Sequence, residues 1–112
     1  MRRGKGEPSA VIAERVMRAR EVQKQRFEGT GIFTNAEMSS KDLETYCPLS
    51  EDCLSLLEKI IDRLGLSARA YTRIIKIART IADLAGSEDI LPQHISEAAA
   101  YRFLDRRNIL EL

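Results

Sequence analysis

One segment of the sequence, from Ser67 to Gly86, limits the possible folds more than any other. Ser67 is a favoured residue for the start of a helix, and Gly86 is a favoured residue just after a helix end. At about 100° per residue, the apolar side chains between them cover about half of a helix surface. They are Ala70, Tyr71, Ile74, Ile75, Ile77, Ala78, Ile81, Ala82, Leu84 and Ala85. We therefore expect a central helix that is largely surrounded by other elements.

The rest of this predicted helix carries a narrow polar stripe, the one edge that we expect to reach water or a ligand. The stripe consists of Arg69, Arg73, Lys76, Thr80 and Asp83. A helix N-terminus carries partial positive charge and unpaired N–H groups, so acidic residues are preferred there. This helix instead has Arg69 in its first turn and Arg73 one turn later. Two cations beside a positive helix end are typical of a site for a phosphate or a carboxylate.

A structural interpretation of the same stripe stays open at this point. The chain contains 17 Asp and Glu residues, any of which could pair with these arginines. Such ion pairs would leave no free cation, and they are the more common outcome for a basic stripe. Periodicity alone does not decide between an anion site and structural pairing.

Length and composition predict one all-α domain. A chain of 112 residues, 44% hydrophobic and 31% charged, can bury one core but not two. It has no internal repeat and no alternating strand pattern of useful length, so we expect a compact bundle of four to five helices. We expect no membrane span, no secretory leader and a cytoplasmic location. The net charge of +1 would not draw the domain onto nucleic acid without a local basic patch.

Four further helices are expected around the central one, in a helical domain that spans residues 9–112 after a linker or flexible lead-in at residues 1–8. They begin near Ser9, Ser40, Ser50 and Pro92. In the loop after the first of them, Ile32 and Phe33 are expected to pin the chain to the core. The expected inward residues are Ile12, Val16, Ala19, Val22 or Gln23, and Phe27 in the first helix; Leu54, Leu57, Ile61 and Leu64 in the third; and Ile95, Ala98, Ala99 and Phe103 in the last.

Several chemistries need residues that this sequence lacks. There is no GxxxxGK[ST] loop for phosphates, so we expect no ATP hydrolysis and no other enzymatic activity from this chain alone. His94 is the only histidine, which leaves no arguable Ser/His/Asp or Cys/His site, and we expect it to face solvent or cap the last helix. With Cys47 and Cys53 it cannot complete a four-ligand zinc site, so no metal site is expected.

The first predicted helix is strongly basic on its outer side. Its basic residues are Arg15, Arg18, Arg20, Lys24 and Arg26, and Glu14, Glu21 and Glu28 offset them in part. A charge-rich face of this kind usually faces solvent. The alternative is a stand-alone interaction module that binds DNA or a protein through Arg15, Arg18 and Lys24, with a purely structural packing domain as a third interpretation.

The residues of the central helix and its flanks resemble one protein family. Residues 65–84 are similar to the sensor 2 helix of the magnesium-chelatase-like AAA+ ATPases, in particular the ComM-type group. Pro8 departs from the serine expected at the start of the first helix. The other matching segments are residues 6–10, 15–16, 19–20, 23, 26–27, 35–36, 38–39 and 104–106, so the resemblance spans nearly the whole chain.

The resemblance implies that this chain is the C-terminal helical lid of a longer ATPase. Its partners would be the AAA+ core domain of the same parent chain and the neighbouring subunits of a hexameric ring. DNA would be the material that the parent remodels or translocates. ATP with Mg²⁺ would be the cofactor of the parent, and this chain alone would bind none.

The resemblance also assigns roles to residues of the polar stripe. Arg69 occupies the position of the sensor 2 arginine, which reaches the γ-phosphate of ATP, and this reverses the preference for a merely structural arginine. Arg73 is a second candidate for nucleotide binding, with pairing to an acidic side chain as its alternative. Lys76 and Arg79 are expected to serve packing or contact with a neighbouring subunit.

Overall fold

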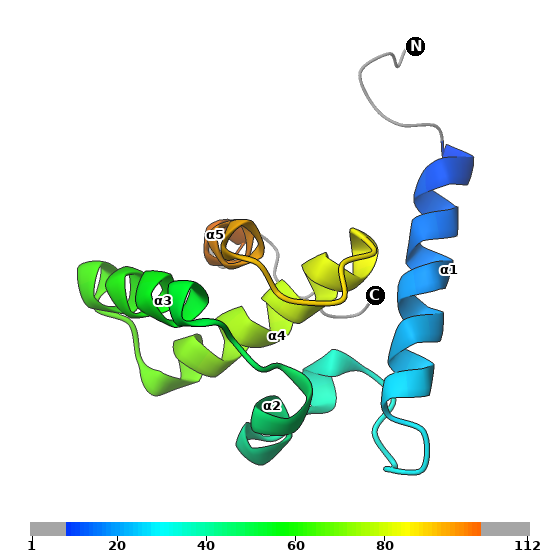
Figure 1. Ribbon diagram of the computed structural model, residues 1–112, viewed down its shortest axis with the longest axis horizontal. Helices are drawn as coiled ribbons and strands as arrows, with labels where there is room; N and C mark the ends of the chain where they lie inside the picture. Colours follow the sequence, from blue (N-terminus) through cyan, green and yellow to red (C-terminus); the bar gives the residue numbers. More distant parts are fainter. Residues whose placement is uncertain (1–8, 102–112) are drawn as a thin grey trace.

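The computed structural model describes residues 9–101, and all of their regular structure is helical (Figure 1). This confirms the all-α fold. Residues 1–8, the expected lead-in, and Phe103 lie outside the described residues. The elements are α1 (Ser9–Arg26), the short 3₁₀ helix η1 (Asn35–Glu37), α2 (Ser40–Tyr46), α3 (Glu51–Leu64), α4 (Ala68–Leu84) and α5 (Pro92–Tyr101).

Serine caps and glycine stops set the helix bounds, as the sequence predicts. Ser39, Ser50 and Ser67 each accept a hydrogen bond from the backbone N–H three residues later. Gly65 and Gly86 follow α3 and α4 in the left-handed backbone region, with φ of 62° and 73°. These signals are local, so they can be recognised before any tertiary contact is known.

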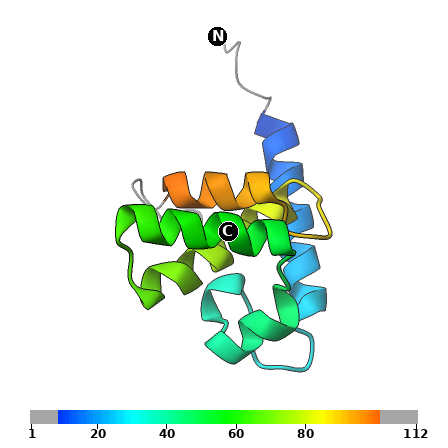
Figure 2. The ribbon, with the colours of Figure 1, turned by 60° about the vertical axis from the view of Figure 1, so that its left-hand side comes forward.

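Helix α4 passes through the middle of the molecule, and the other helices are arranged around it. Figures 1 and 2 show α3 and α5 on one side of α4, α1 beside its C-terminal half, and α2 across another face. Every residue of α4 from Ile77 to Asp83 is buried. The predicted central helix is therefore confirmed.

The predicted polar stripe of α4 is only partly correct. Thr80 and Asp83 were expected at the exposed edge, but they are 1% and 4% exposed. Arg79 is buried as well, at 4% exposure. The reason is that α1 and η1 pack over the second half of α4, so only the first half of the stripe remains accessible.

Some of the predictions of buried apolar residues are also wrong. Phe33 is 76% exposed, whereas its neighbour Ile32 packs against the core as predicted. In α3, Leu54 and Leu64 are 37% and 47% exposed, because the inner face of this helix is centred on Cys53 and Leu57. A helical period locates an apolar face only to within about one residue position, and the neighbouring helices decide which edge is covered.

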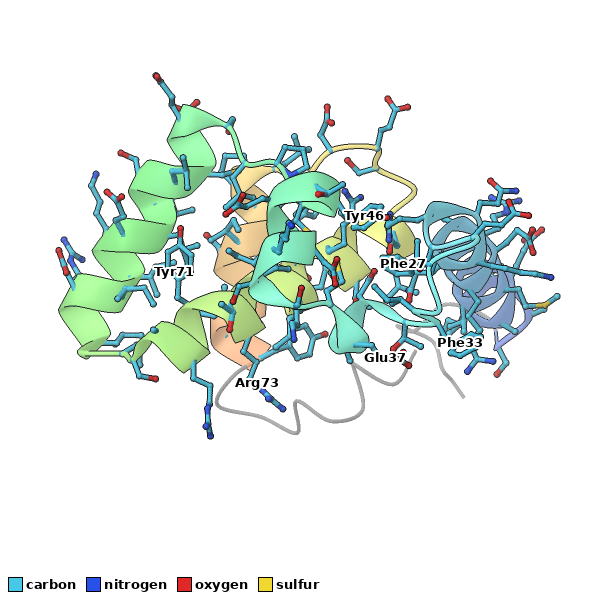
Figure 3. The ribbon with its side chains drawn as sticks, turned by 90° about the horizontal axis from the view of Figure 1, so that it is seen from below. Phe27, Phe33, Glu37, Tyr46, Tyr71 and Arg73 are labelled. Carbon is cyan, nitrogen blue, oxygen red and sulfur yellow. The ribbon has the colours of Figure 1, made fainter. Side chains whose placement is uncertain are left out.

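Helix α1 uses Gln23 rather than Val22 on its inner face, and its contact with α2 is aromatic. Gln23 is 2% exposed and Val22 is 43% exposed. Phe27, directly after α1, meets the ring of Tyr46 edge to face, with 5.1 Å between the ring centroids (Figure 3). Ile12 is 47% exposed, so the first turns of α1 contribute little to the core. None of the helices in residues 9–101 is long and apolar enough to span a bilayer.

Candidate functional site

The side chain of Arg69 lies at the start of α4 and is exposed. Among residues 9–101, nothing accepts a hydrogen bond from its guanidinium or forms an ion pair with it. Its backbone is already helical, since its carbonyl oxygen accepts a bond of 3.0 Å from the Thr72 hydroxyl. The described part of the chain thus leaves a cation available at this helix end.

The backbone at the same helix end also has unused donors. Ser67 caps the helix through its side-chain oxygen, which accepts from the N–H of Ala70 at 3.3 Å. The N–H groups of Ala68 and Arg69 donate to none of the residues that the structure describes. A planar cation and free amides therefore lie together at the positive end of the helix dipole, an arrangement suited to an anion.

Two further cations, Arg73 and Lys76, continue the accessible part of the stripe. Arg73 is half-buried, and its Nε is buried without a hydrogen-bond partner. Figure 3 shows this side chain projecting from α4 beyond the helices drawn. Lys76 donates from Nζ to the carbonyl oxygen of Ala36 at 3.2 Å. Burial, and then the nearby charge of Arg73, lower the pKa of Lys76 below its ordinary value.

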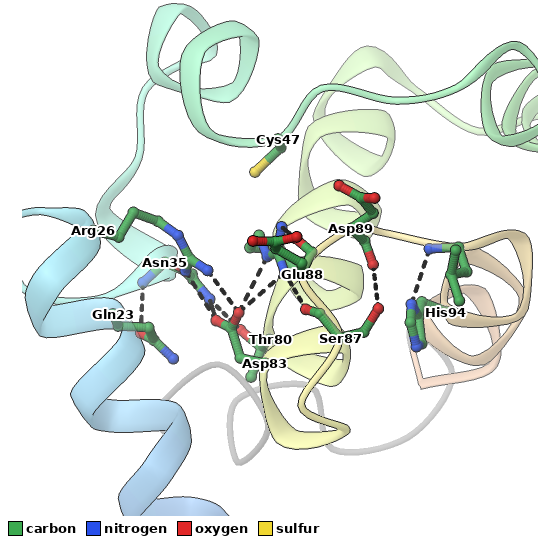
Figure 4. Close-up of polar contacts among 12 residues, drawn as sticks. Gln23, Arg26, Asn35, Cys47, Thr80, Asp83, Ser87, Glu88, Asp89 and His94 are labelled. Carbon is green, nitrogen blue, oxygen red and sulfur yellow. Dashed lines mark hydrogen bonds and ion pairs between the residues drawn. The ribbon is translucent and has the colours of Figure 1, made fainter.

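The second half of α4 carries a buried polar network centred on the carboxylate of Asp83 (Figure 4). Arg26 of α1 donates to both carboxylate oxygens, at 2.9 and 2.7 Å. Arg79 donates from Nε at 3.2 Å, and the amide of Asn35 in η1 donates at 3.0 Å. We call these four residues the Asp83 network. It leaves the buried carboxylate fully hydrogen-bonded, which is the condition for keeping a charge inside a protein.

The Asp83 network connects four parts of the chain. The terminal nitrogens of Arg79 donate to the carbonyl oxygens of Ser87 and Glu88, at 3.0 and 3.1 Å, in the loop after α4. Asn35 also bonds to Thr80, and its backbone N–H donates to the side chain of Gln23. Arg79 therefore has an internal role, in line with the packing role expected for it.

Sequence reasoning did not find this network. Arg26 and Asp83 are 57 residues apart, and no local spacing pairs them. Asp83 was assigned to an exposed stripe, and Arg26 to a solvated basic face. A signal was nevertheless present, because residues 26–27 and 35–36 belong to the segments on which the family resemblance rests. These segments hold Arg26 and Asn35, two of the three side chains that donate to Asp83.

The histidine and the two cysteines are buried inside the domain. His94 is buried and accepts a bond of 2.9 Å at Nδ1 from the N–H of Leu91, so it caps α5. Burial lowers its pKa, mainly by penalising the charged form. Cys47 and Cys53 are buried free thiols, and burial raises the pKa of Cys47 to about 11. In residues 9–101, no three acidic, histidine or cysteine side chains form a group that could hold a metal ion.

The basic side of α1 is partly neutralised. Arg18 pairs with Glu14 at 3.2 Å on the exposed surface, and Arg26 is taken up by the Asp83 network. Lys24 stays exposed beside a cavity of about 440 Å³ at the end of α1, which Phe33 also lines. The alternative interaction surface proposed for Arg15, Arg18 and Lys24 therefore has fewer unpaired cations than the sequence suggests.

Comparison with protein families identifies a match over most of the chain. The family described as the C-terminal domain of the magnesium chelatase subunit ChlI matches residues 6–102. The chain belongs to this family. Three curated relatives align with about nine tenths of the length of this chain.

The three relatives are bacterial proteins much longer than this chain. The competence protein ComM of Haemophilus influenzae is 44% identical over 102 residues, which cover 91% of this chain and 19% of ComM. The uncharacterized YifB proteins of Salmonella typhimurium and Escherichia coli are 41% and 43% identical, and 19% of each is covered. The chain therefore corresponds to one domain of a larger protein.

Proposed function

We propose that this domain is the C-terminal helical lid of a magnesium-chelatase-like AAA+ ATPase. In this proposal Arg69 contacts the phosphates of ATP held by the remainder of the protein. The observation that carries it is the exposed Arg69 guanidinium, which has no partner among the described residues although it lies at a helix N-terminus. Family membership supports the proposal, since the family is named for the C-terminal part of a chelatase subunit.

The chemistry of the helix end fits a phosphate. A guanidinium presents a planar fork of N–H donors that matches two phosphate oxygens, and it stays charged at all physiological pH values. The unused N–H groups of Ala68 and Arg69 add donors at the same end of the helix. Such donors stabilise the negative charge that develops on a phosphoryl group during its transfer. We assign the ligands of Mg²⁺ to the rest of the parent, because the described residues contain no group suited to a metal ion.

Arg73 is the second nucleotide-binding residue in this proposal. Its Nε is buried and has no hydrogen-bond partner, which is costly for a polar group unless something else satisfies it. Arg73 is also one turn from Arg69 along the accessible half of the stripe. Pairing with an acidic side chain of the parent's core is the alternative for this residue.

In this proposal the parent protein forms a hexameric ring in the cytoplasm and acts on DNA. The proposal of DNA rests on the resemblance of this sequence to ComM-type ATPases, and the competence protein ComM is one of the relatives. We do not favour DNA binding by α1 as a second function, because Arg18 and Arg26 are already paired within the domain.

The test is ATP hydrolysis by the full-length protein that carries this domain, with Arg69→Ala and Arg69→Lys compared with wild type. We expect the alanine variant to lose at least about tenfold in kcat, because a phosphate-directed donor is removed. The lysine variant should recover only part of the activity, since it lacks the planar fork.

The matched control is Arg63→Ala, which removes an exposed arginine at the end of α3. It should hydrolyse ATP at the wild-type rate. Equal rates for Arg69→Ala and Arg63→Ala would contradict the proposal.

A further inference from the structure

The loop after α1 presents the most exposed large apolar side chain of the described residues. Phe33 is 76% exposed and lies beside the end of α1 (Figure 3). The loop is nevertheless tied down around it. The N–H of Ile32 donates to the Thr30 hydroxyl at 3.1 Å, and the N–H of Phe33 donates to the Glu37 carboxylate at 3.2 Å. Ile32 also packs against the core. The fold therefore holds an aromatic ring in solvent, where its apolar area is costly to expose.

Phe33 is one wall of the cavity of about 440 Å³ at the end of α1. Phe27, which is part of the core, and Ile32, which packs against it, line the same cavity. Its volume falls within the range of about 300 to 1,000 Å³ that is usual for binding sites. The cavity thus offers apolar walls, one of them aromatic, to an apolar side chain that enters from outside.

Charged side chains from the end of α1 surround these apolar walls. Glu21, Lys24 and Glu28 line the cavity. Within residues 9–101, the side chains of Lys24 and Glu28 form no ion pair and no hydrogen bond, and Glu21 accepts only a long bond of 3.5 Å from Gln25. The rim therefore carries two carboxylates and one ammonium group. This excess of negative charge is complementary to a ligand with positive charge.

The same side of α1 carries a second exposed apolar side chain. Met17 is 70% exposed. At about 100° per residue, Met17, Glu21 and Lys24 fall within about 60° of one another around the helix. Met17 precedes Lys24 by about 10 Å along the helix axis. An apolar side chain, a charged stretch and an apolar cavity thus follow one another along α1, an arrangement long enough for a polypeptide segment. Methionine and aromatic residues are also enriched where proteins meet.

Charge and size decide what kind of partner fits this surface. The phosphates of a nucleic acid would meet an excess of carboxylates. In a symmetric contact between two copies of the chain, the same negative rim would face itself. A standard interface between globular proteins also takes about 20 to 30 residues on each side, far more than the few exposed side chains present. A short segment with a basic residue beside an apolar one satisfies both the cavity and its rim.

We propose that the Phe33 surface, formed by Met17, Glu21, Lys24, Glu28 and Phe33, binds a short segment of a separate protein. An aromatic or large aliphatic side chain of that segment enters the cavity against Phe33. A lysine or arginine beside it meets the carboxylates of Glu21 and Glu28. The inference does not depend on the proposed function. The Phe33 surface belongs to α1 and the loop after it, whereas α4 begins on the opposite side of the molecule (Figure 1).

The experiment selects ligands of the full-length protein from a phage-displayed library of random dodecapeptides, with counter-selection on the Phe33→Ala variant. We expect the recovered peptides to share an aromatic, leucine or methionine residue within a few positions of a lysine or arginine. A synthetic fluorescein-labelled peptide of the shared sequence is then titrated by fluorescence anisotropy. Phe33→Ala should weaken its binding at least about tenfold, because the main apolar contact is lost. Glu28→Lys should weaken it at least about threefold, because the charge of the rim is reversed.

The matched control is Val22→Ala. Val22 is an exposed apolar side chain of the same helix, 43% exposed and about 160° away from Lys24 around the axis. The peptide should bind Val22→Ala with the wild-type affinity. It should also bind Arg69→Ala with the wild-type affinity, because Arg69 lies outside the Phe33 surface.

Several results would overturn the inference. They are the absence of any enriched sequence, enrichment of acidic rather than basic residues, and equal losses of affinity in Phe33→Ala and Val22→Ala. Two further measurements separate the other occupants. Dissociation of full-length copies by Phe33→Ala in analytical ultracentrifugation would assign the surface to contact between copies. Loss of binding to a labelled single-stranded DNA in the same variant would assign it to nucleic acid. Either result would contradict a peptide partner.

Discussion

At the scale of single residues, Asp83 is the central acceptor of the buried polar network. Its carboxylate is buried and receives four hydrogen bonds from three side chains. Two of these side chains, Arg26 and Arg79, carry positive charge and are themselves largely removed from solvent. Loss of the carboxylate charge would therefore leave two cations facing each other without compensation.

We predict that Asp83→Asn lowers the free energy of unfolding of this chain by about 3 to 5 kcal/mol, the usual cost of breaking a buried ion pair. Urea denaturation followed by circular dichroism measures this loss. Asp62→Asn is the control, because Asp62 is exposed on α3 and should change stability by less than about 0.5 kcal/mol. A loss for Asp83→Asn no larger than that of the control would show that the network does not stabilise the fold.

A second residue-scale prediction concerns pH and His94. Burial holds the pKa of His94 below its ordinary value of 6.5, so the folded state binds fewer protons than the unfolded state as the pH falls. The stability contributed by neutral His94 is thus fully present above pH 6.5 and decreases as the pH falls through the unfolded and then the folded pKa. Protonation would also remove the acceptor that Nδ1 offers to the N–H of Leu91.

Urea midpoints measured between pH 7.5 and pH 5 check the sign of this effect. We expect the wild-type midpoint to fall over this range, and the fall to be clearly smaller in His94→Gln, which cannot be protonated. A wild-type curve parallel to that of His94→Gln would mean that His94 does not titrate differently on folding.

At the scale of elements, the bounds of α3 and α4 could be read from the sequence, whereas the partners of α4 could not. Ser67 and Gly86 act on their own backbone neighbours, so their signals survive without knowledge of the fold. The burial of Thr80 and Asp83 depends on α1 and η1, which are far away in the sequence. Local periodicity predicted that these polar residues would be exposed to solvent. They are buried because tertiary hydrogen bonds satisfy their polar groups.

The loop between α1 and η1 illustrates the same limit with apolar residues. Ile32 and Phe33 were both expected to pin this loop, but Phe33 is 76% exposed. Only Ile32 packs against the core. No sequence signal identified which of the two would be inside.

This correction leads to a prediction at the element scale. Phe27→Ala should lower the free energy of unfolding by about 3 to 5 kcal/mol, because it empties a core position that is 2% exposed. Phe33→Ala should change it by less than about 0.5 kcal/mol, since Phe33 is 76% exposed. Thermal or urea unfolding of the two variants measures the difference. A loss of stability as large for Phe33→Ala as for Phe27→Ala would contradict the exposed position of Phe33.

At the scale of the whole molecule, the proposed function gives this domain one part of a nucleotide site and assigns the rest to the remainder of the parent protein. The domain has a free arginine and free amides at the start of α4, but its sequence has no phosphate-binding loop. The sequence could predict the place of Arg69, because a cap and a helix end are local features. It could not reveal what Arg69 meets, because this chain accounts for only 19% of its relatives.

The most direct test is therefore the affinity of the full-length protein for ATP and for ADP, measured by calorimetry with wild type and Arg69→Ala. If Arg69 contacts the γ-phosphate, the variant should lose at least about tenfold in ATP affinity and keep its affinity for ADP. This chain alone should bind either nucleotide weakly or not at all. Unchanged ATP affinity in Arg69→Ala, or tight ATP binding by this chain alone, would contradict the account.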